Sequence, residues 1–577
     1  MPEQTASFTS LIRTLLRPER NFWWLMLIYG IAVSILGLSV PLSVQVLISS
    51  VVNAALINQV VVLAIILFIV LTLSAFFIAV QNYLMELFER RYFARVMSEV
   101  ALRLLHAAQS GLRFTNRADL VNRYFDIMSV QKSMPPLLTG GLATALQSIA
   151  GLILTSFYHP AFLIFNVVTV LAVYLAYRVF DRPAGRTAVA LSTAKYDAAS
   201  WLEEIARSNT FFQSRRGMDY AIQRTEGLRD EYIQQHRRHF HYTFAQAVGL
   251  LLVYAVATST LLGLGGWLVI GGQLTIGQLV AAELVLVGVF YNLTRGIYYL
   301  ELYYDLYAAL NKLTQLVSIE PEKLRSGEHG TAWTSSIDFD SAQIATDRGT
   351  LKFNFSLPAG STAMFVARSS FQENLVADLL RAYVPLSNGQ ILLGEHDIDD
   401  FDAASLRDQV FVVDTTPLPT CSIQSFLRIA NPDISKAEMR RLLDAVGLNI
   451  DQPGIGGTLE QTLMPEGYPL TAVGILKLKI AYALAALPKI LVLTSQFDTF
   501  SQEARIKIMR RLREQQDVTV ICFTHRPDLN DFDKFFFCDF TEQQEFDGAA
   551  EVLAAYSQDI ASVTKSTQKN GDGHEHG

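Results

Sequence analysis

The sequence predicts a chain of two parts: an α-helical membrane domain with six transmembrane helices, followed by an α/β domain with a parallel sheet. Apolar residues gather before residue 300 in runs of about 20, the length that a helix needs to cross a bilayer. After residue 336, short apolar strands alternate with amphipathic helices, which is the pattern of an α/β domain. With 577 residues, 51% of them hydrophobic, and a positive mean hydropathy, the chain fits one membrane part and one soluble part.

The membrane domain is expected over residues 21–310, after an N-terminal segment of residues 1–20. Arg13, Arg17 and Arg20 precede a long apolar run, which indicates a first span rather than a cleaved signal with its shorter core. The six spans are expected at roughly residues 21–52, 59–86, 139–157, 159–178, 242–271 and 275–297.

Basic residues fall in alternate connections between these spans. The connections 87–138 and 178–241 are rich in Arg and Lys, whereas those near 53–58, 157–160 and 271–275 contain none. Because positive residues stay on the cytoplasmic side, both long connections and both termini are predicted to be cytoplasmic. The two connections are too long for turns, so the spanning helices are expected to run on into the cytosol and to end in short helices.

One carboxylate falls inside the sixth span. Glu283 lies in the sequence A-A-E-L-V-L-V, and a carboxylate at membrane depth is costly unless it faces water, a partner or a cavity. It is therefore a candidate for lining a substrate path. The alternative is packing at a helix or subunit interface, and the sequence leaves both open.

Composition excludes several kinds of function. The three cysteines, Cys421, Cys522 and Cys538, have no C-x-x-C spacing, so neither a disulfide framework nor a metal site is predicted. The net charge is −7, and no concentrated basic stripe suggests a nucleic-acid partner.

A linker of residues 311–336 leads to the α/β domain, which is expected over residues 337–560. A polar, glycine-containing tail of residues 561–577 follows and is expected to be disordered. Strands are expected at residues 363–366, 389–393, 490–493 and 518–523, and helices at residues 375–383, 438–446 and 478–487.

Four connected stretches of this domain resemble the ATP-binding cassette of bacterial ABC exporters. They are PLSNGQILLGEHDIDDFDAASLRDQVFVV (385–413), SIQSFL (422–427), PLTAVGILKLKIAYALAALPKILVL (469–493) and VTVICFTHRPDLNDFDKFFF (518–537). The six-span half resembles the membrane domain of the same exporters, and VPLSVQVL (40–47) is similar to type I secretion subunits. The resemblance implies a P-loop-like nucleotide-binding domain, a half-transporter and the bacterial inner membrane as its location.

At residues 365–375 the chain reads F-V-A-R-S-S-F-Q-E-N-L, where the resemblance implies a phosphate-binding loop. Such a loop needs glycines that let backbone N–H groups wrap the phosphates, a lysine, and a hydroxyl for magnesium. Neither a glycine nor a lysine occurs here. The lysine position is Glu373 or Gln372, depending on the register, and the hydroxyl position is Asn374 or Glu373. The remaining candidates of this degenerate loop are Arg368, a candidate source of positive charge, Ser369 and Ser370.

The resemblance implies four more positions that differ from the family pattern. Thr346 stands where an aromatic residue stacks on adenine, and Thr415 where a glutamine senses magnesium and water. Thr494 takes the place of the magnesium-associated aspartate, and Ser495 that of the catalytic glutamate. A neutral hydroxyl does not replace a carboxylate as a base or as a counter-charge to a metal.

The signature loop, which contacts ATP held by the opposite subunit in this family, reads Leu470, Thr471, Ala472, Val473 and Gly474. Thr471 keeps a hydroxyl, but Ala472 and Val473 replace two glycines and hinder close backbone approach. His525 matches the family's switch histidine. It either senses a γ-phosphate or remains as a packing residue, and the loss of its neighbours favours packing.

These positions together predict a pseudo-ATPase subunit of an ABC exporter that binds no cofactor at its own site. ATP and Mg²⁺ are expected only at a composite site with an intact ABC half-transporter partner in the bilayer, with secretion-complex components as further candidate partners. The alternatives are a non-transporting membrane scaffold or regulator with this fold, and an active homodimeric export ATPase.

Overall fold

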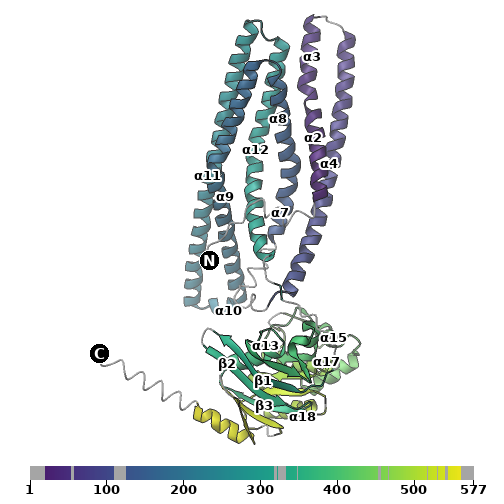
Figure 1. Cartoon of the computed structure of the whole chain (residues 1–577), viewed down its shortest axis with the longest axis vertical. Coiled ribbons are helices and arrows are strands. Elements are labelled where there is room, and N and C mark those ends of the chain that lie inside the picture. Colours follow the sequence, from purple (N-terminus) through teal and green to yellow (C-terminus); the bar gives the residue numbers. More distant parts are fainter. Residues whose placement is uncertain are drawn as a thin grey trace, which may run out of the picture. The chain divides into compact units, whose positions relative to one another are not determined.

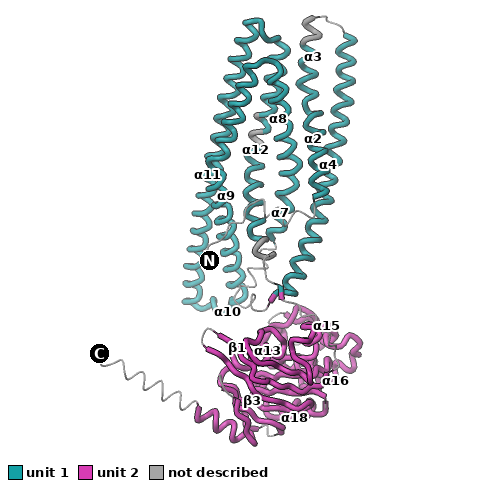
Figure 2. The backbone as a smooth tube through the Cα atoms, in the orientation of Figure 1, with its two compact units in different colours: residues 1–107, 111–321 teal, residues 108–110, 322–577 magenta. Residues whose placement is uncertain are grey.

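The computed structural model describes most of the chain. The described residues are 20–53, 57–108, 125–317, 321–322, 333–346, 349–452, 457–464, 467–515, 517–528, 531–539 and 543–559. The chain forms two compact units, one of residues 1–107 and 111–321 and the other of residues 108–110 and 322–577 (Figure 2). The predicted domain boundaries at residues 20, 310, 336 and 560 stay predictions. The predicted tail 561–577 lies outside the described residues.

The first unit consists of helices (Figure 1). They are α2 (Arg20–Gly37), α3 (Ser39–Asn53), α4 (Ile57–Leu105), α7 (Phe125–Pro136), the π-helix η2 (Leu137–Gly141), α8 (Leu142–Ser156), α9 (Pro160–Arg207), α10 (Asn209–Phe212), α11 (Arg215–Ile270) and α12 (Ile276–Val317). Five stretches in the described residues are long and apolar enough to cross a bilayer: Arg20–Ile48, Ile57–Leu105, Phe125–Ser156, Pro160–Arg207 and Arg215–Ile270. The predicted sixth span corresponds to a shorter apolar stretch, Ile276–Val289, within α12.

Three of these helices are much longer than a bilayer crossing. The helices α4, α9 and α11 have 49, 48 and 56 residues, whereas about 20 suffice to span the hydrocarbon core. The spanning helices therefore continue beyond their apolar stretches, as predicted. The short helix α10 joins α9 to α11, and the Trp201 Nε1–H donates to Thr225 Oγ1 at 2.9 Å between the two long helices.

The second unit contains two main sheets. The strands β2 (Gly349–Leu357), β1 (Ile337–Thr346), β4 (Asn388–Leu393) and β5 (His396–Asp397) form an antiparallel sheet in that order. The second sheet has the order β12 (Gln543–Phe546), β11 (Lys534–Cys538), β3 (Thr362–Ala367), β10 (Thr519–Phe523), β9 (Ile490–Leu493) and β6 (Val410–Val413). All its neighbours pair in parallel except β12 with β11, which confirms the predicted parallel core.

Helices and short strands complete the second unit. They are α13 (Ser370–Leu380), the 3-10 helix η3 (Ile398–Asp400), α14 (Ala403–Gln409), β7 (Cys421–Ser422), α15 (Ile423–Ala430), α16 (Lys436–Ala445), β8 (Thr462–Leu463), α17 (Ala472–Ala486), the 3-10 helix η4 (Ser495–Thr499) and α18 (Gln502–Arg513). A further helix of residues 549–559 follows β12. Each predicted strand and helix of this half is present, with ends shifted by a few residues.

The core of the parallel sheet explains where a site can form. Every residue of β3, β9 and β10 is buried, and Phe365 stacks on Phe536 with ring centroids 4.9 Å apart. The segments that follow β3, β10 and β9 leave the same edge of the sheet, because neighbouring parallel strands end together there. In open α/β sheets this carboxyl edge is the usual place for a ligand.

Candidate functional site

The connection from β3 to α13 is very short. The strand β3 ends at Ala367 and α13 begins at Ser370, so only Arg368 and Ser369 lie between them. The Gln372 Oε1 accepts a hydrogen bond from the Ser369 backbone N–H at 3.1 Å and fixes the start of the helix. The sequence prediction began this helix at Leu375. The spacing Ser369-x-x-Gln372 is a capping-box signal that would have placed its start correctly.

The structure brings Glu373 and Ser495 together at this edge. The Glu373 side chain is only 3% exposed, and its Oε2 accepts a hydrogen bond from the Ser495 backbone N–H at 2.9 Å. Glu373, one of the two residues predicted for the lysine position, thus accepts a hydrogen bond from the residue predicted for the glutamate position. By contrast, Ser370 and Asn374 are exposed on the outside of the same helical turn.

Thr494 is part of the sheet framework. Its side chain is buried, and the hydroxyl donates to the Val413 carbonyl at 2.8 Å, which ties the end of β9 to the end of β6. Thr415 lies two residues beyond Val413 and is exposed. Neither residue carries a charge that could balance a magnesium ion.

The Arg368 side chain forms ion pairs with two aspartates. Its guanidinium pairs with Asp539 at 3.0 Å and with Asp559 at 2.9 Å. Two carboxylates therefore balance the one basic side chain of residues 365–375. The sequence left the placement of Arg368 open. In the structure its guanidinium is paired with two carboxylates, so it is a poor source of attraction for phosphate.

His525 is also held by its surroundings. Its backbone N–H donates to Asp498 Oδ2 at 2.9 Å, and its Nε2 lies 3.1 Å from the Ala367 carbonyl oxygen. The Thr524 hydroxyl donates to the other Asp498 oxygen. The imidazole further contacts the Tyr556 ring, with centroids 4.8 Å apart. A packing and hydrogen-bonding function accounts for each of these contacts.

The signature residues form the start of α17. Thr471 is the N-cap, and its Oγ1 accepts a hydrogen bond from the Gly474 N–H at 3.1 Å. Thr471 and Ala472 are exposed, Val473 is half-buried, and Leu470 and Gly474 are buried. The exposed hydroxyl of Thr471 is available to a partner, although its oxygen already caps the helix.

Lys479 is an anchoring residue that the sequence prediction missed. Its buried ammonium donates to the Asp414 carbonyl at 2.7 Å, to Asp414 Oδ1 at 2.8 Å and to the Thr416 carbonyl at 2.7 Å. Burial alone would raise the pKa of the Asp414 carboxyl, but hydrogen bonds from Lys479 and Thr416 lower it below its ordinary value. The signal was a lysine among the apolar residues of α17, because a buried charge needs a partner.

Two other predicted residues belong to elements outside the parallel sheet. Thr346 ends β1, is exposed, and donates from its hydroxyl to the Gly349 carbonyl at 2.7 Å. Glu283 belongs to α12 of the helical unit and is half-buried. In the described part of the chain, no group of three His, Cys, Asp or Glu side chains is arranged to hold a metal ion.

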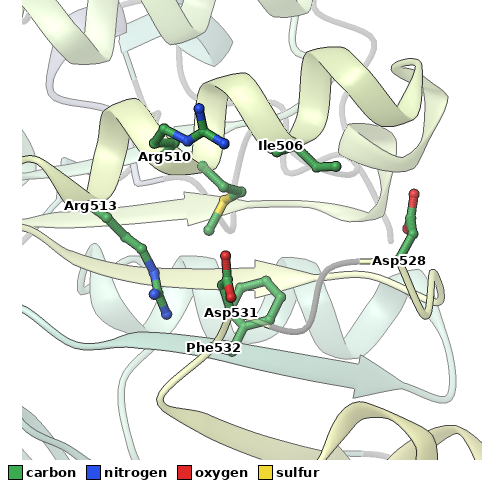
Figure 3. Close-up of a pocket in the computed structure, with 7 residues that line it drawn as sticks. Ile506, Arg510, Arg513, Asp528, Asp531 and Phe532 are labelled. Atoms are coloured by element: carbon green, nitrogen blue, oxygen red, sulfur yellow. The ribbon is translucent and has the colours of Figure 1, made fainter.

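Two of the best-formed pockets contain none of the predicted site residues. A pocket of about 380 Å³ lies between α18 and the segment that follows β10 and is lined by Arg510, Arg513, Asp531 and Phe532, among others (Figure 3). A pocket of about 470 Å³ in the helical unit is lined by residues of α9, α11 and α12, among them Arg186, Asp197 and Glu231.

Comparison with known proteins agrees with the two-part architecture. Residues 23–293 match the family described as the ABC transporter transmembrane region. An ABC transporter ATP-binding protein of Bacillus subtilis, YknV, is 23% identical over 488 residues, which cover 80% of this chain and 80% of that protein. An ATP-dependent lipid A-core flippase of Photobacterium profundum is 28% identical over 231 residues, which cover 38% of this chain and 39% of the flippase.

A solved structure matches almost the whole chain. It is a bacterial Atm1-family ABC exporter with ATP bound, with a TM-score of 0.75 and 18% sequence identity. The match covers 95% of this chain and 98% of that one. At this identity the match establishes the fold of both halves and leaves the chemistry to the residues themselves.

Proposed function

The membrane half of this chain belongs to the ABC transporter transmembrane region family, and from that premise we propose that the chain is the pseudo-ATPase subunit of an ABC exporter. The chain is a multi-pass membrane protein of the ABC exporter type. The proposal adds that its own cassette does not hydrolyse ATP, and that the energy comes from a second, intact cassette.

One observation carries the proposal: the buried Glu373 carboxylate bonded to the Ser495 N–H at 2.9 Å. In the register that places Glu373 at the position of a phosphate-binding lysine, its carboxylate replaces attraction by repulsion. A unit charge about 4 Å from a phosphate charge is worth on the order of 4 kcal/mol at an effective dielectric constant near 20. Each 1.4 kcal/mol changes affinity about tenfold, so the proposal expects very weak ATP binding at this loop.

The catalytic positions support the same proposal. Thr494 hydrogen-bonds within the sheet, and Ser495 offers a hydroxyl instead of a carboxylate. A general base must accept a proton from water, and a serine hydroxyl does not do this near neutral pH. With Arg368 paired to two aspartates, the site lacks the charges that phosphoryl transfer uses.

A partner follows from how these exporters assemble. ABC exporters work in a membrane and often as dimers, and in this fold each ATP lies between one subunit's phosphate loop and the other's signature loop. We propose an intact ABC half-transporter as the partner, with its ATP and Mg²⁺ facing Thr471 of this chain. The proposed location is the bacterial inner membrane with both termini cytoplasmic, and Glu283 is the candidate for lining the shared path.

The test is ATP hydrolysis by the purified chain in lipid nanodiscs, alone and after co-expression with candidate ABC half-transporters. The expected result is no turnover above background alone and turnover only in a complex. Robust turnover by the chain alone, lost in a Ser495→Ala or Glu373→Ala variant, would overturn the proposal and favour the active homodimer.

A scaffold or regulator is the second candidate, and the Lys479 contacts favour it. The three bonds from Lys479 tie α17 to the segment after β6 and favour a cassette of one fixed shape. Crosslinking between this chain and its partner with and without ATP separates the two functions. A scaffold gives the same crosslinks in both states, whereas a transporter subunit changes them.

A further inference from the structure

The helix of residues 549–559 contacts both sides of the candidate site. Tyr556 and Asp559 are three residues apart, so they lie on one face of this helix. Asp559 meets the residue that follows β3, and Tyr556 meets the histidine that follows β10. No predicted motif included either residue.

Asp559 pairs with Arg368 through one hydrogen bond and one further ion-pair contact. The Arg368 Nη2 donates to Asp559 Oδ1 at 3.0 Å, and Nε lies 2.9 Å from Oδ2. Asp539, which follows β11, accepts from Arg368 Nη1 at 3.0 Å. About a quarter of the Arg368 and Asp559 side chains is exposed, so this two-point ion pair is partly shielded from water. Such fork-to-carboxylate pairs fix geometry as well as adding stability.

Tyr556 covers the histidine on the other side. Its ring lies 4.8 Å from the His525 ring and 6.4 Å from the Phe537 ring, centroid to centroid. The His525 Nε2 in turn lies 3.1 Å from the carbonyl of Ala367, the residue directly before Arg368. The two contacts of the helix therefore converge on adjacent residues of one backbone segment.

We propose that residues 549–559 form a strap that holds Arg368, Ser369 and His525 in one conformation without nucleotide. Asp559 of the strap, together with Asp539, pairs with Arg368, the one basic side chain of residues 365–375. The strap also places the Tyr556 ring against the His525 ring, with the two ring planes tilted by 56°. An incoming phosphate would have to displace Asp539 and Asp559 from Arg368 before it could use that charge. This inference concerns the chain by itself and goes beyond the proposed dependence on a partner.

Hydrogen–deuterium exchange of the full chain in nanodiscs, without nucleotide or partner, tests the strap. The variants are Asp559→Asn, Tyr556→Ala and the double variant, and the peptide followed covers residues 365–373. Each single variant is expected to raise the exchange of this peptide on the order of tenfold, because local opening replaces the lost contacts. The double variant is expected to exchange no faster than the faster single one, since either change already releases the helix. The exposed Glu551 of the same helix supplies the matched control, Glu551→Gln, which should leave the peptide unchanged.

Conservative variants separate the strap from general loss of structure. Tyr556→Phe keeps the ring and Asp559→Glu keeps the charge, and both are expected to exchange like the unmodified chain. The strap is overturned if neither Asp559→Asn nor Tyr556→Ala exceeds the Glu551→Gln control. It is equally overturned if only one of them does, or if the two effects multiply in the double variant, because the contacts would then act separately. An active ATPase found with the chain alone would sink the proposed function and leave this measurement untouched.

Discussion

Glu373 and Ser495 are joined by a hydrogen bond of 2.9 Å from the serine backbone N–H to the glutamate carboxylate. The bond connects the first turn of α13 to the first residue of η4, so it crosses the carboxyl edge of the parallel sheet. In one of the two registers that the resemblance allows, these two positions belong to a lysine and a glutamate on either side of a nucleotide. Here they meet each other directly.

Replacing Glu373 by alanine should destabilise the cassette. The partly buried Ser495 N–H would lose its acceptor, which costs about 1 kcal/mol. The measurement is thermal or urea unfolding of the full chain, followed by cassette fluorescence. Glu373→Gln keeps an oxygen acceptor at the same distance from the backbone, so it is expected to lose clearly less free energy of unfolding. Equal losses for the two variants would mean that the hydrogen bond is not what Glu373 contributes.

Lys479→Met should be among the most destabilising single changes in the cassette. It leaves the partly buried Asp414 carboxylate and two carbonyl groups without their donor, and breaking a buried pair from one side costs about 3–5 kcal/mol. Lys477→Met on the same helix is the matched control, because Lys477 is half-buried and bonds to a single carbonyl, that of Gly447. The double variant Asp414→Asn with Lys479→Met should recover part of the loss. A Lys479→Met chain as stable as Lys477→Met would contradict the anchoring function.

The Asp414 carboxyl should make the stability of the cassette fall in acid. Its pKa is lowered in the folded chain from an ordinary value of 3.8, because bonds from Lys479 and Thr416 outweigh the opposing effect of burial. A lowered folded pKa means that the stabilisation is present above 3.8 and is lost as the pH falls through the folded value. Unfolding midpoints between about pH 5 and pH 2.5 should therefore decline less for Asp414→Asn than for the unmodified chain. Parallel declines would show that other carboxyls, such as Asp402 and Asp533, dominate.

Thr471 should matter for activity only in a complex with an intact partner. Under the proposed function its hydroxyl faces the partner's ATP, and losing one such hydrogen bond is expected to lower turnover on the order of tenfold. Thr471→Ala also removes the cap of α17, which costs about 1 kcal/mol of stability. Thr471→Ser keeps both the hydroxyl and the cap, so it should preserve turnover and stability together. Unchanged turnover of the complex with Thr471→Ala would argue that this signature loop contacts no nucleotide.

The sequence predicted the architecture well because the relevant signals are local. Runs of apolar residues defined the spans, and alternating short elements defined the α/β half with its parallel core. The start of α13 was placed five residues late, at Leu375 instead of Ser370, because the Ser369–Gln372 capping signal went unused. The pairing of Arg368 with Asp539 and Asp559 had no local signal, since both aspartates lie more than 170 residues from Arg368 in the chain.

The two-residue connection between β3 and α13 also limits what substitutions could change in this cassette. A phosphate-wrapping loop of the form G-x-x-x-x-G-K sets several residues between the strand and the helix, and here only Arg368 and Ser369 are available. Point substitutions could restore a lysine or a glycine, but they could not lengthen the backbone. Under the proposed function, building such a loop here would need an insertion as well as replacements. Substitutions alone would therefore leave this cassette without a backbone of the length that wraps a phosphate.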